Sequence, residues 1–143
     1  IGHSLGAAQC TQSLGDVLHM QSRYTEAVPM LEEAKLAFEA IGNPLGAAQC
    51  TQSLGIVLMQ QDRREDGILR LEQAEVQFLA IGNGDDVAQC SELLGNALRI
   101  QQRYNEARSK LIRARDIYLE LGFLTDVEDC VNALAALPTE AVE

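Results

Sequence analysis

Four cysteines are the residues of this chain best suited to covalent or metal chemistry. They are Cys10, Cys50, Cys90 and Cys130, and they recur every 40 residues. A zinc site usually needs two thiols only a few residues apart. A disulfide needs Cα atoms within about 7 Å, which is closer than stacked helices usually lie. The spacing therefore predicts small buried thiols at equivalent places of a repeated structure, with no metal and no disulfide.

The two histidines offer little for catalysis. His3 and His19 both lie in the first 40 residues and have no counterparts 40 residues later. The sequence contains no grouping of nucleophile, base and acid, no phosphate-binding loop and no metal motif. We therefore expect a protein that is not an enzyme, with no catalytic residue, no metal and no cofactor.

The charge of the chain restricts its partners. The 143 residues include 21 acids and 11 bases, which gives a net charge of -10. An acidic surface repels phosphate backbones, so nucleic acid is not an expected partner. No apolar run approaches the roughly 20 residues that cross a bilayer, and no signal-peptide pattern opens the chain. These features predict a cytoplasmic protein with no membrane partner.

A 40-residue repeat organises the chain. Ile1-Gly2 recurs as Ile41-Gly42 and Ile81-Gly82, and the run Leu5 to Gly15 is identical to the run Leu45 to Gly55. A repeat of this length indicates stacked supersecondary units. We expect a single array with repeats at 1–40, 41–80 and 81–120, a C-terminal capping helix within 121–138 and a tail at 139–143.

Each repeat has the apolar spacing of two helices. In the first repeat Ala7, Cys10 and Leu14 follow one helical face, and Ala27 and Leu31 begin a second face after a polar break. We expect first helices near 5–21, 44–61, 84–101 and 125–137, and second helices near 24–40, 64–80 and 104–120.

Helix ends are marked by turn and capping residues. Gly42 suits the left-handed conformation past a helix end, Asn43 suits an N-cap and Pro44 suits the first turn. Thr125 and Glu128 have the spacing of a capping box, which predicts that the last helix begins there.

The repeat resembles the tetratricopeptide repeat. The residues that carry the resemblance in the first copy are Leu14-Gly15, Leu18, Arg23-Tyr24, Glu26-Ala27, Leu31 and Ala34. The long period is similar to that of Pins-type adaptors and of the repeat sensor regions of STAND-class signalling ATPases. The resemblance implies an all-α, right-handed superhelical α-solenoid of helix-turn-helix repeats with about seven antiparallel helices. It also implies a protein-binding module whose first helices line a concave face.

The candidate partner-binding residues are the non-core positions of these first helices. Three of the positions in each repeat differ between copies although the rest of the helix is nearly identical, which indicates either a recognition surface or drift at exposed sites. The candidates are Gln12, Asp16, His19, Met20, Gln52, Ile56, Met59, Gln60, Glu92, Asn96, Arg99 and Ile100.

Two functions follow from this reading. The first is a non-catalytic scaffold that binds a peptide or partner helix on its concave face, as part of a larger signalling protein. The alternative is a structural spacer or oligomerisation module without a dedicated ligand. Leu14 and Leu18 have no preceding repeat to cover them. We therefore also expect self-association through this uncapped N-terminal face.

Overall fold

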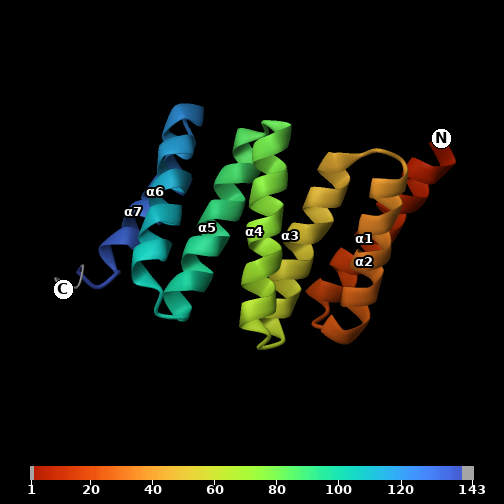
Figure 1. The fold of residues 1–143 in the computed structure, drawn as a ribbon, viewed down its shortest axis with the longest axis horizontal. Helices are drawn as coiled ribbons and strands as arrows, with labels where there is room; N and C mark the ends of the chain where they lie inside the picture. The colour runs from red at the N-terminus through yellow and green to blue at the C-terminus, as the bar shows by residue number, and fades with distance from the viewer. Residues whose placement is uncertain (1, 140–143) are drawn as a thin grey trace. The chain divides into compact units, whose positions relative to one another are not determined.

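The computed structural model describes residues 2–139, and all the regular structure among them is α-helical (Figure 1). This confirms the predicted all-α fold of helix-turn-helix repeats, and the helix bounds differ from the predicted ones by only a few residues. In the described part of the chain the helices are α1 (Gly2–Met20), α2 (Tyr24–Ala40), α3 (Pro44–Gln60), α4 (Arg64–Ile81), α5 (Gly84–Ile100), α6 (Tyr104–Leu121) and α7 (Leu124–Ala135).

The chain divides into two compact units, which are described separately. Unit 1 extends to Ile81 and contains α1 to α4, and unit 2 begins at Gly82 and contains α5 to α7. The expectation of one continuous array therefore stays a prediction. Most of the tail predicted at 139–143 lies outside the described residues.

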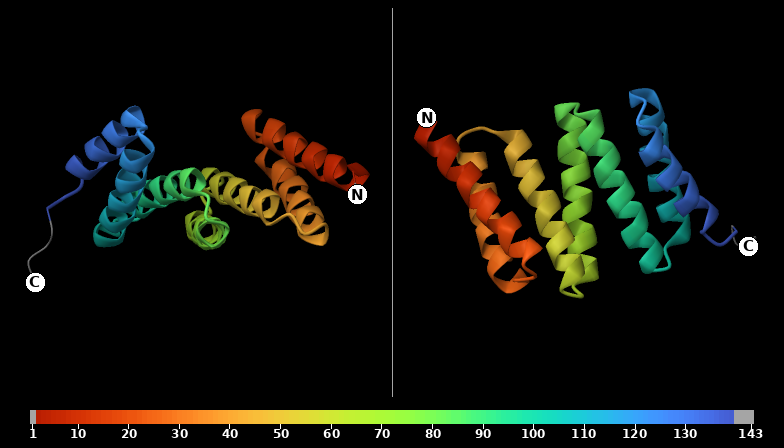
Figure 2. Two further views of the ribbon diagram at one scale, coloured as in Figure 1. Left: turned by 90° about the horizontal axis from the view of Figure 1, so that it is seen from above. Right: turned by 180° about the vertical axis from the view of Figure 1, so that it is seen from behind.

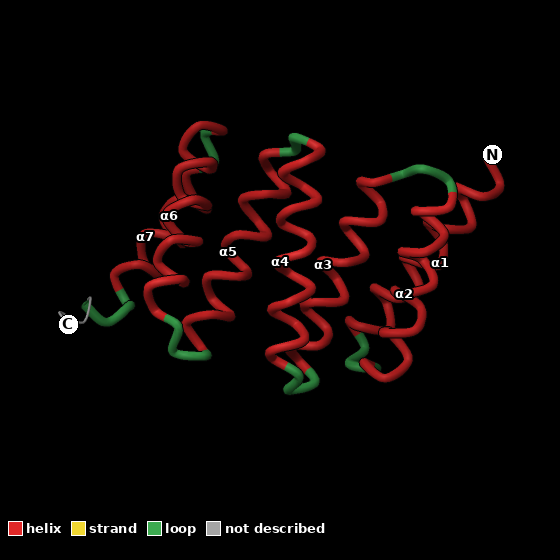
Figure 3. The backbone as a smooth tube through the Cα atoms, in the orientation of Figure 1, coloured by secondary structure: helices red, strands yellow, loops and turns green. Residues whose placement is uncertain are grey.

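Short turns join the helices (Figure 3). Gly42 has φ +69°, which is the left-handed conformation predicted for it. Asn43 caps α3, since its Oδ1 accepts a hydrogen bond from the Gly46 N–H at 3.0 Å. The turn between α1 and α2 places Ser22 at φ 59°, although serine rarely adopts this conformation. The sequence analysis did not anticipate that strained position.

The capping box predicted at Thr125 and Glu128 is wrong. Helix α7 begins at Leu124, so Thr125 lies inside its first turn, and the N-cap Phe123 makes no side-chain cap hydrogen bond. The Phe123 ring instead packs beside Tyr118, with the ring centroids 6.4 Å apart. This aromatic contact fixes the chain at the start of α7, so the polar cap is not used.

Helix α2 forms the centre of unit 1, because it packs against both α1 and α3. Ala27 and Leu31 of α2 form a buried cluster with Leu54 and Val57 of α3. At Gly15 of α1 a Cβ atom would lie 2.8 Å from the Leu31 side chain. Glycine is therefore required for the close approach of α1 and α2.

Two predictions about α1 need correction. Leu18 was expected to be uncovered, but it is buried in the same cluster as Leu31. Leu14 was expected to fill the space between α1 and α2, but 51% of its surface is exposed. The reason is direction: Leu18 points toward α2 and α3, whereas Leu14 lies on the outer side of α1.

Unit 2 is closed by α7, which lies along α6 (Figure 2). Cys130 of α7 is fully buried in a cluster with Ala88, Ala114 and Tyr118. On the other side of α7, Glu128 and Asp129 are exposed. This arrangement confirms that the last helix covers the third repeat and turns an acidic face to water.

Candidate functional site

The cysteines are structural. All four are free, and Cys50, Cys90 and Cys130 are buried as predicted. Burial raises the pKa of Cys50 to about 12, and the nearby Asp16 carboxylate adds to the rise. Because only the thiolate is a good nucleophile or metal ligand, this thiol is unreactive near neutral pH. Cys10 is exposed, contrary to the prediction, because no helix of the described chain covers that side of α1.

Metal and membrane sites were also searched. Within residues 2–139 no group of three or more His, Cys, Asp or Glu side chains is arranged to hold a metal ion. None of the helices described is long and apolar enough to span a membrane.

In unit 1 the structure brings together polar side chains of α1 and α3. The His19 Nε2 atom donates a hydrogen bond to Gln60 Oε1 at 2.6 Å. Asp16 accepts a side-chain hydrogen bond from Ser53. These two contacts join the first helix of one repeat to the first helix of the next. Three of the predicted binding residues, Asp16, His19 and Gln60, therefore share one surface.

Asp16 is the electrostatically unusual residue of this surface. Its partial burial raises the pKa above the ordinary aspartate value, while the charge of His19 and the Ser53 hydrogen bond act in the opposite direction. No lysine or arginine contributes to the shift of this carboxylate. A desolvated carboxylate without a cationic partner can gain energy from a donor or cation on a ligand.

Unit 2 carries a second polar site, on α5, α6 and α7. The Tyr118 hydroxyl donates a hydrogen bond to Glu92 Oε1 at 3.0 Å. Burial raises the pKa of Glu92, Tyr118 lowers it, and the charges of Asp126 and Asp129 raise it further. Glu92 is thus held in place by Tyr118 beside two other acids.

Replacing Glu92 by glutamine is expected to raise the thermal midpoint at pH 7 by about 2–4 °C. The amide oxygen still accepts the Tyr118 hydrogen bond, while the desolvated charge beside Asp126 and Asp129 is removed. The raised pKa means that the folded chain binds more protons than the unfolded chain just above the ordinary glutamate value of 4.5. Stability from Glu92 therefore falls as pH rises through this window.

The measurement is thermal unfolding of both chains between pH 4.5 and pH 7. The advantage of the Glu92→Gln variant should shrink as the pH falls toward 4.5, because Glu92 of the natural chain then becomes protonated. Glu128→Gln, on the exposed side of α7, is the matched control for the change in net charge. A lower midpoint for Glu92→Gln at pH 7 would show that the charge of Glu92 stabilises the fold.

The other predicted residues differ in exposure. Met20 is 82% exposed and Ile100 is 47% exposed. Met59 lies close to α4, since a Cβ atom at Gly67 would be 2.8 Å from Met59 Cγ. Part of the Met59 side chain therefore serves packing within the hairpin. The remaining candidates comprise the exposed Arg99 and the partly exposed Gln12, Gln52, Ile56 and Asn96.

Tyr118 was missed as a site residue, although the repeats contain a signal for it. The first repeat pairs Gln12 with Phe38, whereas the third repeat has Glu92 and Tyr118 at the equivalent positions. The carboxylate and the hydroxyl thus occur together in the one repeat where they bond.

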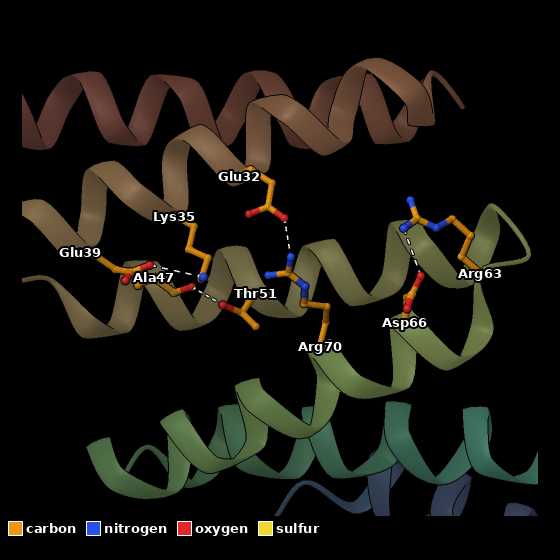
Figure 4. A network of polar contacts seen from close by, with 8 residues as sticks. All are labelled: Glu32, Lys35, Glu39, Ala47, Thr51, Arg63, Asp66 and Arg70. Carbon is orange, nitrogen blue, oxygen red and sulfur yellow. Dashed lines mark hydrogen bonds and ion pairs between the residues drawn. The ribbon is translucent and has the colours of Figure 1, made fainter.

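The second-helix side of unit 1 also has a polar groove, of about 440 Å³, between α2 and α4. Figure 4 shows its charged side chains in pairs: Arg70 with Glu32 at 2.6 Å and Arg63 with Asp66 at 3.1 Å. Lys35 pairs with Glu39 at 3.4 Å. Each of these cations already has an acid as its partner, so this groove is a weaker candidate for a ligand site than the first-helix faces.

Comparison with known proteins gives the fold. No protein-family model and no curated protein matches the chain. Aspartyl phosphate phosphatase F from Bacillus subtilis is similar in structure, with TM-score 0.82, 13% identity, and coverage of 87% of this chain and 33% of that chain. The Rap conjugation gene regulator of plasmid pLS20, solved with the Phr* peptide, has TM-score 0.71, 19% identity, and coverage of 84% and 34%.

A third similar structure is BtubC (BKLC) from P. vanneervenii, with TM-score 0.69, 15% identity, and coverage of 95% of this chain and 67% of that chain. The chain spans about a third of the length of the first two proteins. At these identities the likeness concerns the fold alone. The chain has a tetratricopeptide-like helical-repeat fold.

Proposed function

We propose that the chain is a non-catalytic interaction module that binds a peptide or partner helix along its first helices. The observation that carries this proposal is the surface of unit 1 on which Asp16 and His19 of α1 meet Ser53 and Gln60 of α3. Its polar groups are held in place by contacts between helices and remain partly exposed. Such a surface offers fixed donors and acceptors along a face that the core does not use.

The differences between repeats support the same proposal. The helix core is identical in the first two copies, yet Asp16 and His19 correspond to Ile56 and Met59. The ligand therefore meets different chemistry at successive helices, as an extended peptide with varied side chains would. The structurally similar Rap regulator was solved with a peptide, Phr*, which agrees with this class of ligand. We extend the proposal to a cytoplasmic signalling protein of the Pins or STAND kind.

A selection of random 12-residue peptides displayed on phage tests the proposal. Peptides that bind the natural chain are synthesised and measured against Asp16→Lys and against Glu33→Lys. Both substitutions change the charge equally, but Glu33 is exposed on the second helix α2. We expect Asp16→Lys to weaken binding by about tenfold or more and Glu33→Lys to leave it unchanged.

Circular dichroism of the three chains shows whether the fold is kept. If both variants fold and bind the selected peptides equally well, the ligand does not use the first-helix face of unit 1. If the selection yields no binder, the spacer or oligomerisation function gains weight.

A further inference from the structure

The outer side of α1 carries an exposed apolar groove that no function described above uses. Two adjoining hollows of about 470 and 520 Å³ meet at Leu14. We call this surface the α1 groove. It is lined along α1 by residues one helical turn apart, namely Gly6, Cys10, Leu14 and Val17.

The same four residues recur on α3, where they are covered. Gly46, Cys50, Leu54 and Val57 stand 40 residues later and are identical in type. Leu54 and Val57 are 0% exposed, whereas Leu14 is 51% exposed and Val17 is 47% exposed. The α3 copy of this surface is covered by α2. The chain therefore contains one occupied and one open copy of a single helix-binding surface.

The occupied copy shows which side chains fill the groove. The ring of Phe38 lies over Gly46, where a Cβ atom would be only 2.4–2.6 Å from three ring carbons. Toward the other end of α3, Ala27 and Leu31 pack on Leu54 and Val57. At Gly6, the counterpart of Gly46, nothing lies within 4 Å of a built Cβ atom. The open groove thus has space for an aromatic ring at Gly6.

The second helices share one spacing of side chains. Each has a small residue, a leucine four positions later, a further small residue after three positions and an aromatic ring after four more. In α2 these are Ala27, Leu31, Ala34 and Phe38; in α6 they are Ala107, Leu111, Ala114 and Tyr118.

We propose that the α1 groove binds an amphipathic helix of a partner, with a leucine and an aromatic residue seven positions apart. The aromatic ring lies over Gly6 and the leucine packs on Leu14 and Val17, with the helix antiparallel to α1 as α2 is to α3. The partner helix is not supplied by a second folded copy, because Phe38, Phe78 and Tyr118 are each at most 2% exposed in their own chain. The net charge of -10 also opposes close pairing of two copies.

Binding of a synthetic helix tests the proposal. The probe is a fluorescein-labelled peptide with the sequence of residues 21–43, carrying Pro29→Ala because proline disfavours an isolated helix. Pro29 is exposed in α2, so the change leaves the apolar face intact. Fluorescence anisotropy with the 143-residue chain is expected to show saturable binding. A peptide that also carries Phe38→Ala is expected to bind about tenfold or more weakly.

Gly6→Ala is the discriminating variant of the chain. The added methyl group meets nothing in the free chain, so helical content and thermal midpoint are expected to stay equal or rise. The same methyl group occupies the place of the aromatic ring, so affinity for the peptide is expected to fall about tenfold or more. Gly84→Ala in α5 is the matched control, because its Cβ atom meets only Ile117 at 3.8 Å.

Three results would overturn the proposal. The first is no binding of the peptide by the folded chain at concentrations up to about 1 mM. The second is equal binding by Gly6→Ala, which would mean that the peptide replaces α2 on α3 instead. The third is a dimer of the free chain, seen by sedimentation, that Gly6→Ala dissociates. That last result would assign the α1 groove to a second copy.

Discussion

Replacing Gly67 by alanine is expected to lower the free energy of unfolding of unit 1 by about 3 kcal/mol. Gly67 lies where α4 passes closest to α3. A Cβ atom there would be 2.8 Å from the carbonyl oxygen of Gly55 and 2.8 Å from Met59 Cγ. A backbone oxygen cannot turn aside, so the two helices must separate and the cluster around Leu71 must loosen. Alanine otherwise favours a helix by up to about 1 kcal/mol, which makes the expected loss informative.

Urea unfolding followed by circular dichroism measures this loss. Gly6→Ala is the control in the same unit, since its Cβ atom has open space, and it should be neutral or slightly stabilising. The double variant Gly67→Ala with Met59→Ala separates the two contacts. If it recovers stability, the Met59 side chain causes the strain, and if it does not, the Gly55 backbone does. Full stability of the single variant would contradict the close spacing of α3 and α4.

This contact explains a departure between repeats that the sequence alone did not resolve. The first repeat has His19 and Ala27 where the second has Met59 and Gly67. In the structure the Met59 side chain comes within reach of the position that a Cβ atom of Gly67 would take. The loss of one methyl group on α4 is thus matched by a flexible side chain on α3.

Helix positions were predictable because their signals are local. Gly42, Asn43 and Pro44 determine the junction of α2 and α3 through their own backbone preferences and one hydrogen bond. The start of α7 was not predictable in this way. It depends on the Phe123 ring beside Tyr118, a contact that local capping rules do not contain.

The candidate site was predictable only as a list of helix positions. Periodicity places Asp16 and His19 on one side of α1, but their partners Ser53 and Gln60 depend on how α1 and α3 lie against each other. The same limit applies to Glu92, whose raised pKa arises from burial and from acids on α7. Which of these residues touch a ligand stays a prediction.

Leu54→Ala is expected to destabilise unit 1 by about 3 kcal/mol, whereas Leu14→Ala should change stability by less than about 0.5 kcal/mol. The two leucines have identical neighbours in sequence, from Leu5 to Gly15 and from Leu45 to Gly55. Leu54 is buried against α2, and its loss leaves a cavity among Leu31, Val57 and Leu18. Leu14 already contacts water over half of its surface, so its loss creates none.

Urea unfolding of the two variants provides the comparison, because both remove the same atoms from the same helical context. Equal losses would mean that Leu14 is covered in solution by a second copy, and repeating the measurement at lower protein concentration would then reduce the loss for Leu14→Ala alone. Unequal losses of the expected size would show that identical sequence has different energetic weight in α1 and α3. The missing stabilisation at Leu14 is then what a helix bound in the α1 groove would supply.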